Sequence, residues 1–310
     1  GYDMCMAGGW FDAMPIPELR EVIKETDEYI VTRNGAGASV RNWKKQASTP
    51  EYIDFSMTSR AVWDEKYRQH LLKPDRKRLN IEETKRQLAK QKKAGYWTFY
   101  GNQFIWENMR GSMGNYCMLE SLLLDQDWIR DFNRVYTDFY KSQYRILFEE
   151  AGRPDGIWIY EDLGYRNGLM CSPAVLSELV FPYYRELVDF FHSYDLPVIL
   201  HTDGLIDEAI PLIIEAGFVG LNPLEIKSGC DPFKYAEQYG DKLVFSGGFD
   251  GRILESGDRQ LIKKGIIDLV DGMKSRGARF LFGVDHSVSS DVAYGDFKYA
   301  LEVYREHMWY

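Results

Sequence analysis

Residues 198–204 read VILHTDG, an apolar run that ends in a histidine, an aspartate and a glycine. The same order, a short apolar run followed by polar residues and glycine, recurs at 156–164 and at 243–250. Stretches with helical periodicity separate these runs. Short strands that alternate with helices are joined by right-handed crossovers and form a parallel sheet, so the sequence predicts an α/β fold.

Six short apolar runs after residue 95 are predicted strands: Tyr96–Tyr100, Gly156–Tyr160, Val198–His201, Val219–Asn222, Leu243–Ser246 and Arg279–Val284. The segments between and after them are predicted helices: Asp127–Glu150, Pro173–Tyr194, Ile206–Ala216, Pro232–Tyr239, Asp258–Arg276 and Asp291–Glu306. Polar residues repeatedly follow the strands, and barrel enzymes hold their active-site residues at the carboxyl ends of their strands. We therefore predict a (β/α)8 TIM barrel, with its two remaining strands in residues 1–12 or 101–155.

The earlier part of the chain is predicted to be less regular. Residues 28–43 alternate around the turn dipeptide Asn34-Gly35, which predicts a β-hairpin. Residues 49–63 are expected to be irregular. Residues 73–93 are rich in Lys and Arg with interleaved acids, which favours a solvated helix over a nucleic-acid surface.

The composition, with 45% hydrophobic and 27% charged residues, is that of a globular protein, so we expect a single domain over residues 1–310, with 1–94 as its N-terminal hairpin and helical extension. The net charge of −9 argues against a general nucleic-acid binder. No apolar run approaches the roughly 18 residues of a membrane span, and no signal segment is present, so we expect a cytoplasmic protein without a membrane partner. The four cysteines lack C-x-x-C spacing and are expected to be free thiols. The chain begins at Gly1 without an initiator Met, which leaves open whether residues precede it.

Two of the five histidines, His201 and His286, directly follow predicted strands. In a barrel, two such histidines would point into the same mouth. Carboxylates stand at equivalent strand ends: Asp203, Glu225 and Asp285. The remaining histidines are predicted to be structural or at the surface: His70, His192 and His307. A single strand-end histidine would be expected only to bind a loop, but this set favours a functional site.

Four of these residues could act together: His201, Asp203, Glu225 and His286. Imidazoles and carboxylates in an open site can bind a divalent metal, and the nitrogen ligands favour zinc. The same groups could instead form a metal-free acid–base cluster. The residues alone leave both possibilities open.

Further residues are expected in the same mouth. Adjacent Glu161 and Asp162 point to opposite sides of a strand, and we expect Asp162 near the substrate with Glu161 as its structural partner. Gly247-Gly248 permits close backbone approach, which fits either a bound anion or tight packing. The residues expected to take part in catalysis are Asp162, His201, Asp285 and His286. Those expected to contact the substrate are Tyr100, Asn102, Glu161, Asn222 and Gly247.

Several segments together resemble the uroporphyrinogen decarboxylase superfamily. They are HTDGLIDE at 201–208, AGFVGLNPLE at 216–225, GDKLVFSGGFD at 240–250, DHSV at 285–288 and EDLG at 161–164. The resemblance runs from about residue 155 to residue 305 and implies a (β/α)8 barrel enzyme. The superfamily contains metal-free porphyrinogen decarboxylases and zinc methyltransferases that serve corrinoid proteins, thiols, folates or methoxylated compounds. The decarboxylases carry an arginine-rich N-terminal loop, whereas residues 1–30 of this chain contain a single arginine, Arg20.

The resemblance also implies a ligand set. The thiol methyltransferases of the superfamily carry His-x-Cys and a later Cys, and the related methionine synthases add a Glu between them. Here Asp203 and His286 stand at the two cysteine positions, with His201 and Glu225 at the others. Oxygen ligands make a bound metal harder and a better Lewis acid for an oxygen-bearing substrate than for a thiol.

The resemblance thus implies a zinc-dependent methyltransferase that moves a methyl group from a methoxylated small molecule to a corrinoid protein, as an O-demethylase component. Cobalamin would then be carried by that partner, and a homodimer is a family expectation. One alternative is a metal-free decarboxylase that acts on a tetrapyrrole or a small aromatic acid. A second is a non-catalytic barrel that binds cobalamin or a tetrapyrrole.

Overall fold

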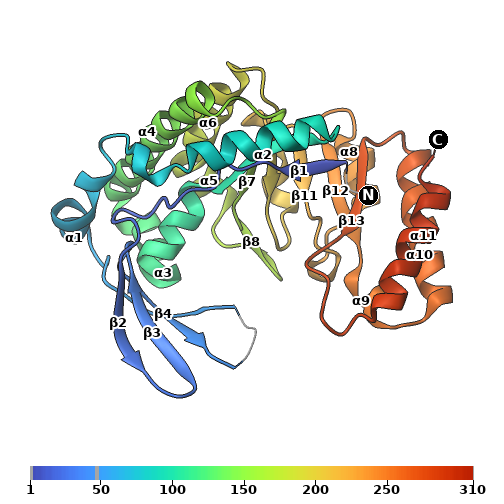
Figure 1. The fold of residues 1–310 in the computed structure, drawn as a ribbon, viewed down its shortest axis with the longest axis horizontal. Coiled ribbons are helices and arrows are strands. Elements are labelled where there is room, and N and C mark those ends of the chain that lie inside the picture. The colour runs from blue at the N-terminus through green and yellow to red at the C-terminus, as the bar shows by residue number, and fades with distance from the viewer. Residues whose placement is uncertain (1–2, 46–48, 310) are drawn as a thin grey trace. The chain divides into compact units, whose positions relative to one another are not determined.

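The computed structural model describes residues 3–45 and 49–309. These residues form two compact units, and each is described by itself. Unit 1 comprises Gly1–Tyr160 and Ala174–Leu196, and unit 2 comprises Glu161–Pro173 and Pro197–Tyr310. Figure 1 labels their elements.

Unit 1 contains three parallel strands: β1 (Met4–Met6), β6 (Trp97–Gln103) and β7 (Gly156–Tyr160). β6 lies between the other two, because Phe99 stands opposite both Met6 of β1 and Gly156 of β7. The helices of this unit are α1 (Arg60–Val62), α2 (Ile81–Lys93), α3 (Ile105–Leu124), α4 (Gln126–Glu150), α5 (Pro173–Leu179) and α6 (Phe181–His192). α4 packs against α3 and α6, and its buried aromatic stripe provides much of the core.

Unit 1 also contains an antiparallel sheet in chain order: β2 (Arg20–Glu25), β3 (Tyr29–Asn34), β4 (Ala38–Trp43) and β5 (Glu51–Phe55). The predicted hairpin is confirmed, with Arg33 opposite Ser39 across its turn. The prediction that residues 49–63 are irregular was wrong, because they contain β5. Tyr52 and Ile53 in the middle of β5 are both exposed, so no alternating buried face marked this strand.

Of the predicted helix over residues 73–93, only α2, which begins at Ile81, is an α-helix. Asn80 caps its first turn by accepting from the Glu83 N–H, and only a short 3-10 turn at Arg76–Arg78 precedes it. The predicted helix at Pro173–Tyr194 is two helices, because Val180 leaves the helical conformation between α5 and α6. The charge pattern of the first prediction extends beyond the cap at Asn80, and the apolar pattern of the second extends across the break at Val180.

Unit 2 contains four parallel strands: β10 (Val198–His201), β11 (Gly220–Asn222), β12 (Val244–Phe249) and β13 (Phe280–Val284). Each pairs with the next along the chain, and His201 stands opposite Asn222 where β10 and β11 end. A short hairpin, β8 (Gly164–Tyr165) with β9 (Gly168–Leu169), precedes them. The helices are α7 (Ile210–Glu215), α8 (Pro232–Tyr239), α9 (Gly251–Glu255), α10 (Arg259–Ser275) and α11 (Tyr294–His307).

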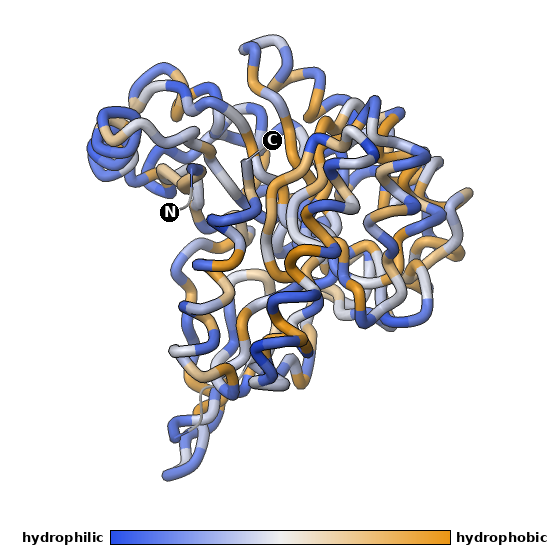
Figure 2. The backbone as a smooth tube through the Cα atoms, turned by 90° about the vertical axis from the view of Figure 1, so that its right-hand side faces the viewer, coloured by the Kyte–Doolittle hydropathy of each residue, from blue (hydrophilic) through white to orange (hydrophobic). Residues whose placement is uncertain are grey.

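The predicted fold class is confirmed: parallel strands alternate with helices through both units, as in TIM-like barrels. β1 supplies one of the two strands that the sequence left unassigned, and it lies within residues 1–12. Residues 101–155 supply α3 and α4 beyond the end of β6, and no eighth barrel strand is present among the described residues. Hydrophobic residues run along the extended segments and alternate with hydrophilic ones along the helices (Figure 2).

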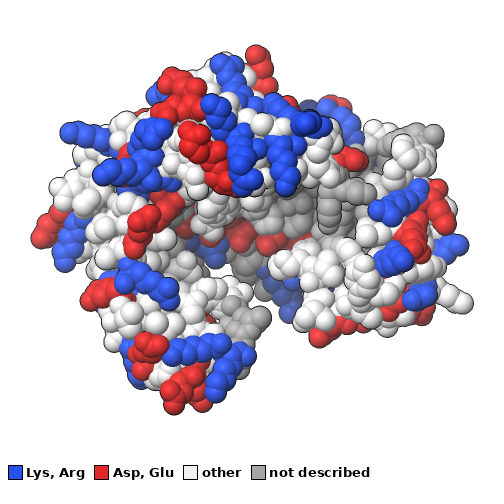
Figure 3. Space-filling view, viewed as in Figure 1, with Lys and Arg blue, Asp and Glu red and all other residues white. Residues whose placement is uncertain are grey.

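The surface carries both signs of charge. On the face in Figure 3, Lys and Arg side chains are interspersed with Asp and Glu. Among the described residues no helix is both long and apolar enough to cross a bilayer. The four cysteines are free thiols, as predicted.

Candidate metal centre

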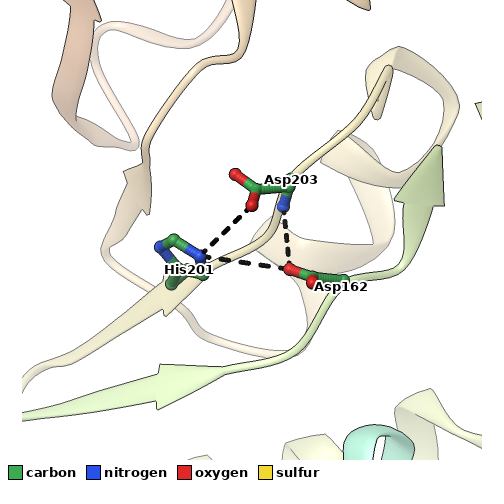
Figure 4. A group of neighbouring side chains, drawn as sticks. All are labelled: Asp162, His201 and Asp203. Carbon is green, nitrogen blue, oxygen red and sulfur yellow. Dashed lines mark hydrogen bonds and ion pairs between the residues drawn. The ribbon is translucent and has the colours of Figure 1, made fainter. Parts of the chain in front are cut away.

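Three side chains of unit 2 meet just beyond the end of β10: Asp162, His201 and Asp203 (Figure 4). The Nε2 atom of His201 lies 3.8 Å from Asp203 Oδ2 and 4.0 Å from Asp162 Oδ1. The Asp203 N–H donates to Asp162 Oδ1 at 3.2 Å, which joins the two loops. Each residue offers one ligand atom, and these atoms lie within 4.8 Å of one another. This spacing is close enough for one cation to contact all three after small side-chain rotations.

The ring of His201 is oriented by the neighbouring strand. Its Nδ1 atom lies 2.6 Å from Asn222 Oδ1, and Asn222 Nδ2 donates to the backbone oxygen of Ser246 at 3.1 Å. A backbone oxygen can only accept, so the Asn222 amide presents its oxygen to the histidine. The proton of the neutral ring is therefore on Nδ1, and Nε2 is the acceptor that faces the carboxylates. Metal-binding histidines are held in this way, with the other ring nitrogen donating to an oxygen.

Asp203 is the less exposed of the two carboxylates in the group, with 25% of its side chain accessible against 37% for Asp162. Burial raises its pKa, the Asp162 and Glu225 carboxylates raise it further, and His201 and His286 lower it. Its Oδ1 atom is buried and has no hydrogen-bond partner in the described part of the chain. An unpaired buried carboxylate oxygen is costly, and a cation at this position would offset that cost. The donor set therefore fits a divalent metal with nitrogen and oxygen ligands.

His286 also reaches this group, from the loop after β13. Its Nε2 atom lies 3.6 Å from Asp203 Oδ2, and 45% of its side chain is exposed. It thus stands at the open side of the cluster, where a proton can be exchanged with solvent or with a bound molecule.

Glu225, predicted as a metal ligand, holds the turn that carries Asp203. Its Oε2 atom accepts from the Gly204 N–H at 2.7 Å, and its Oε1 atom lies 3.0 Å from Lys227 Nζ. Burial opposes its ionisation, but hydrogen bonds from Lys227, Ser228 and Gly204 lower its pKa below the ordinary value. Both oxygens therefore have partners within the protein. Gly204 has φ +88°, and a Cβ atom there would overlap the backbone of the β8 segment.

Asp285, predicted as a catalytic residue, is 2% exposed. Its Oδ2 atom accepts from the Ile226 N–H and its Oδ1 atom from the Gly251 N–H, each at 2.9 Å. One carboxylate thus joins the loops that follow β11, β12 and β13. Gly247 has φ +109°, and a Cβ atom there would overlap the Pro223 carbonyl, so this glycine serves tight packing between neighbouring strand ends.

Three other residues predicted to contact substrate are almost completely or fully buried: Glu161, Tyr100 and Asn102. Glu161 is fully buried, and its N–H donates to the His201 carbonyl at 2.9 Å. In unit 1 the Tyr100 hydroxyl donates to the Gly152 carbonyl at 2.9 Å, and Asn102 Nδ2 donates to the Phe11 carbonyl at 3.3 Å. Both of these side chains are almost completely buried.

The sequence analysis missed two features of this centre. Asp162 was predicted near the substrate but not as a neighbour of the metal ligands, although EDLG directly follows the predicted strand Gly156–Tyr160. Lys227 was not considered, because a lysine two positions after a glutamate carries no signal by itself. Its role depends on the turn that brings it back onto Glu225.

Comparison with known proteins agrees with this architecture. The family model for uroporphyrinogen decarboxylase (URO-D) matches residues 132–307, more than half of the chain. Among solved structures, a methyltransferase from Methanosarcina mazei matches with a TM-score of 0.63 and 16% identity, over 87% of this chain and 76% of that one. At this identity the likeness concerns the fold alone.

Two further solved structures match more weakly. An uncharacterised protein covers 53% of this chain and 43% of its own, with 13% identity and a TM-score of 0.32. A Xaa-Pro dipeptidase with bound methionine covers 55% of this chain and 43% of its own, with 16% identity and a TM-score of 0.26. Neither bears on the fold, and no functionally curated protein matches the chain. On the family match, which confirms the resemblance seen in the sequence, the chain belongs to the uroporphyrinogen decarboxylase family.

Proposed function

We propose that this chain is a zinc-dependent methyltransferase that takes a methyl group from a methoxylated small molecule and passes it to a corrinoid protein. The observation that carries the proposal is the buried Oδ1 atom of Asp203, which has no partner among the described residues and belongs to a carboxylate whose Oδ2 atom lies 3.8 Å from the acceptor nitrogen of His201. A protein gains nothing in stability from such an arrangement unless a cation completes it.

The residues that would hold zinc are Asp162, His201 and Asp203, which leaves a fourth position open for substrate. Bound there, zinc supplies a Lewis acid that withdraws electrons from an ether oxygen. Glu225 is assigned to positioning rather than to the metal, because both of its oxygens already have partners.

The remaining polar residues fix the geometry of the ligands. Asn222 orients the His201 ring, Glu225 holds the Asp203–Gly204 turn, and Asp285 ties together three neighbouring loops. Such outer contacts are what keep a metal site open at one position and rigid at the others. We assign Asp285 to this positioning role because it is buried away from solvent with both oxygens engaged.

In the transfer, the bond between the methyl carbon and the ether oxygen breaks and its electron pair stays on oxygen. A corrinoid partner in the Co(I) state would supply the electron pair for the new bond to carbon. The oxygen then needs a proton, and His286 stands at the open side of the cluster to hold that proton on Nε2. The Asp203 carboxylate, with Oδ2 3.6 Å from this nitrogen, would stabilise the positive charge of the protonated ring.

Metal content tests the proposal directly. Purified wild type should contain about one zinc per chain, as should His286→Ala and the control His192→Ala, a change on the exposed end of α6. His201→Ala and Asp203→Asn should contain almost none. His286→Ala should nevertheless lose methyl transfer, because the proton donor is gone while the metal remains. A wild-type protein that takes up no zinc even after reconstitution would contradict the proposal and leave a metal-free reaction to be tested.

A further inference from the structure

A pocket of about 600 Å³ lies in unit 2, and none of the residues of the metal cluster lines it. One wall is the β8–β9 hairpin and the segment that follows it, where β8 is labelled in Figure 1. The other wall is the loop that leaves β10, from Leu205 to Glu208. This volume is that of pockets that bind small organic molecules.

Both walls of the pocket are held by contacts within the protein. The Leu205 N–H donates to the Tyr165 carbonyl at 2.9 Å, which ties the loop to the hairpin. Further along the loop, the Asp207 carboxylate accepts from the Lys234 ammonium group and from the Tyr235 hydroxyl of α8. The pocket is therefore already formed without a ligand, as small-molecule sites usually are.

Part of the pocket lining is apolar. Leu169, Pro173 and Leu205 contribute hydrocarbon surface to it. Burial raises the pKa of the Cys171 thiol to about 12, so this side chain stays protonated and behaves as a small apolar group. A ligand with a hydrocarbon body would remove these side chains from water, which favours binding.

The charged residues that line the pocket, Asp207 and Glu208, are both acidic. Asp207 is neutralised by Lys234, whereas Glu208 has no ion-pair partner in the part of the chain that the structure describes. No lysine or arginine is among the described residues of the lining. An ammonium group would pair with the Glu208 carboxylate, and a carboxylate ligand would be repelled by it.

We propose that this pocket binds a small primary amine whose ammonium group pairs with Glu208 and whose apolar body packs against Leu169, Pro173 and Leu205. The pocket joins hydrocarbon surface to a carboxylate that lacks a cation, and an amine with an apolar body matches both. This site is separate from the metal cluster and does not depend on the proposed methyl transfer.

Calorimetric titration of the full chain, as purified and after chelation of metal, tests the site. The probe is 2-phenylethylamine, and two molecules of similar shape serve for comparison: neutral 2-phenylethanol and anionic 3-phenylpropionate. Wild type should bind the amine most tightly, the alcohol more weakly and the carboxylate least. The affinity for the amine should be the same in both metal states, because no residue of the metal cluster takes part.

Two variants separate the charge from the apolar surface. Glu208→Gln should weaken binding of the amine roughly three- to tenfold and leave binding of the alcohol unchanged. The matched control Glu306→Gln removes another exposed glutamate of unit 2 and should change neither. Leu169→Ala should weaken binding of the amine and of the alcohol alike, by about threefold.

Three results would overturn the proposal. They are the absence of saturable amine binding to wild type, equal affinity for the amine and the carboxylate, and equal effects of Glu208→Gln and Glu306→Gln. Loss of amine binding on chelation would place the amine on the metal and would also remove this site. A chain that binds the amine but takes up no zinc would retain the pocket and lose only the methyltransferase mechanism.

Discussion

The strand ends of the two units differ in chemistry although they occupy the same place in the βα repeat. In unit 2, β10 and β11 end in His201 and Asn222, and an aspartate and a histidine follow β13. In unit 1, β1 and β7 end in Met6 and Tyr160. The fold offers each strand end as a possible site, and the side chains placed there determine its chemistry.

The two regions also differ in the kind of side chain that they gather at their strand ends. Unit 2 gathers carboxylates and imidazoles around the buried Oδ1 atom of Asp203, which has no partner in the part of the chain that the structure describes. Unit 1 exposes Met6 and Trp10, which a stable fold would normally bury. Departures of this kind lower stability and are expected where function requires them.

The largest expected effect comes from Asp285, on which the polar region of unit 2 depends. Asp285→Ala leaves the half-buried N–H groups of Ile226 and Gly251 without the carboxylate that accepts from them, and should lower the free energy of unfolding by about 3 kcal/mol. Denaturant unfolding measures this, with the exposed Asp291→Ala as control. An unchanged stability would mean that the loops of unit 2 do not depend on this carboxylate.

Much of this contrast between the strand ends could be predicted from the sequence, because it depends on the order of residues within short stretches. His201, Asp203 and His286 directly follow apolar strands, and the pattern predicted that they would meet. The predicted strands at Gly156–Tyr160 and Val198–His201 match β7 and β10 to the residue. A short buried strand followed by a polar residue and glycine is a signal that needs no knowledge of the rest of the chain.

Features that depend on contacts distant in sequence could not be predicted in this way. Asp285 was grouped with the catalytic residues because it follows a strand, but its two partners come from loops about 34 and 59 residues earlier. The faces of β6 were likewise undetermined: Tyr100 and Asn102 point into packed protein, while Gly101 between them faces Tyr160. Alternation along a strand means that neighbouring side chains point to opposite faces of the sheet. It does not tell which of the two faces lies toward the site.

A smaller effect is expected from substitution of Asn222, which tests whether the orientation of the His201 ring affects zinc binding. Asn222→Leu keeps the size of the side chain but removes the acceptor for His201 Nδ1, and should weaken zinc affinity about 10- to 100-fold. Asn222→Asp keeps an acceptor and should restore most of that affinity. Competition with a chelating dye measures both, and equal affinity of the Leu variant and wild type would remove Asn222 from the site.

The smallest effect concerns unit 1 away from its strand ends, where Glu186 of α6 binds Arg134 and Lys141 of α4. Hydrogen bonds from Arg134, helped by Lys141 and opposed by burial, lower the pKa of Glu186 to about 2. Because the pKa is lower in the folded state, its contribution to stability is complete above the ordinary value of 4.5 and is lost as the pH falls toward 2.

Glu186→Gln should therefore destabilise the protein at pH 7 by about 1 kcal/mol, since the pair is partly exposed and screened by solvent. The difference from wild type should shrink as the pH falls below 4.5 and vanish near pH 2. Glu178→Gln, at a pair with Arg130 that is more exposed, is the matched control and should have almost no effect. A pH-independent difference would mean that Glu186 acts through packing rather than charge. The charges of Glu186, Arg134 and Lys141 would then contribute little to stability, and α4 and α6 would be held together mainly by their packed side chains.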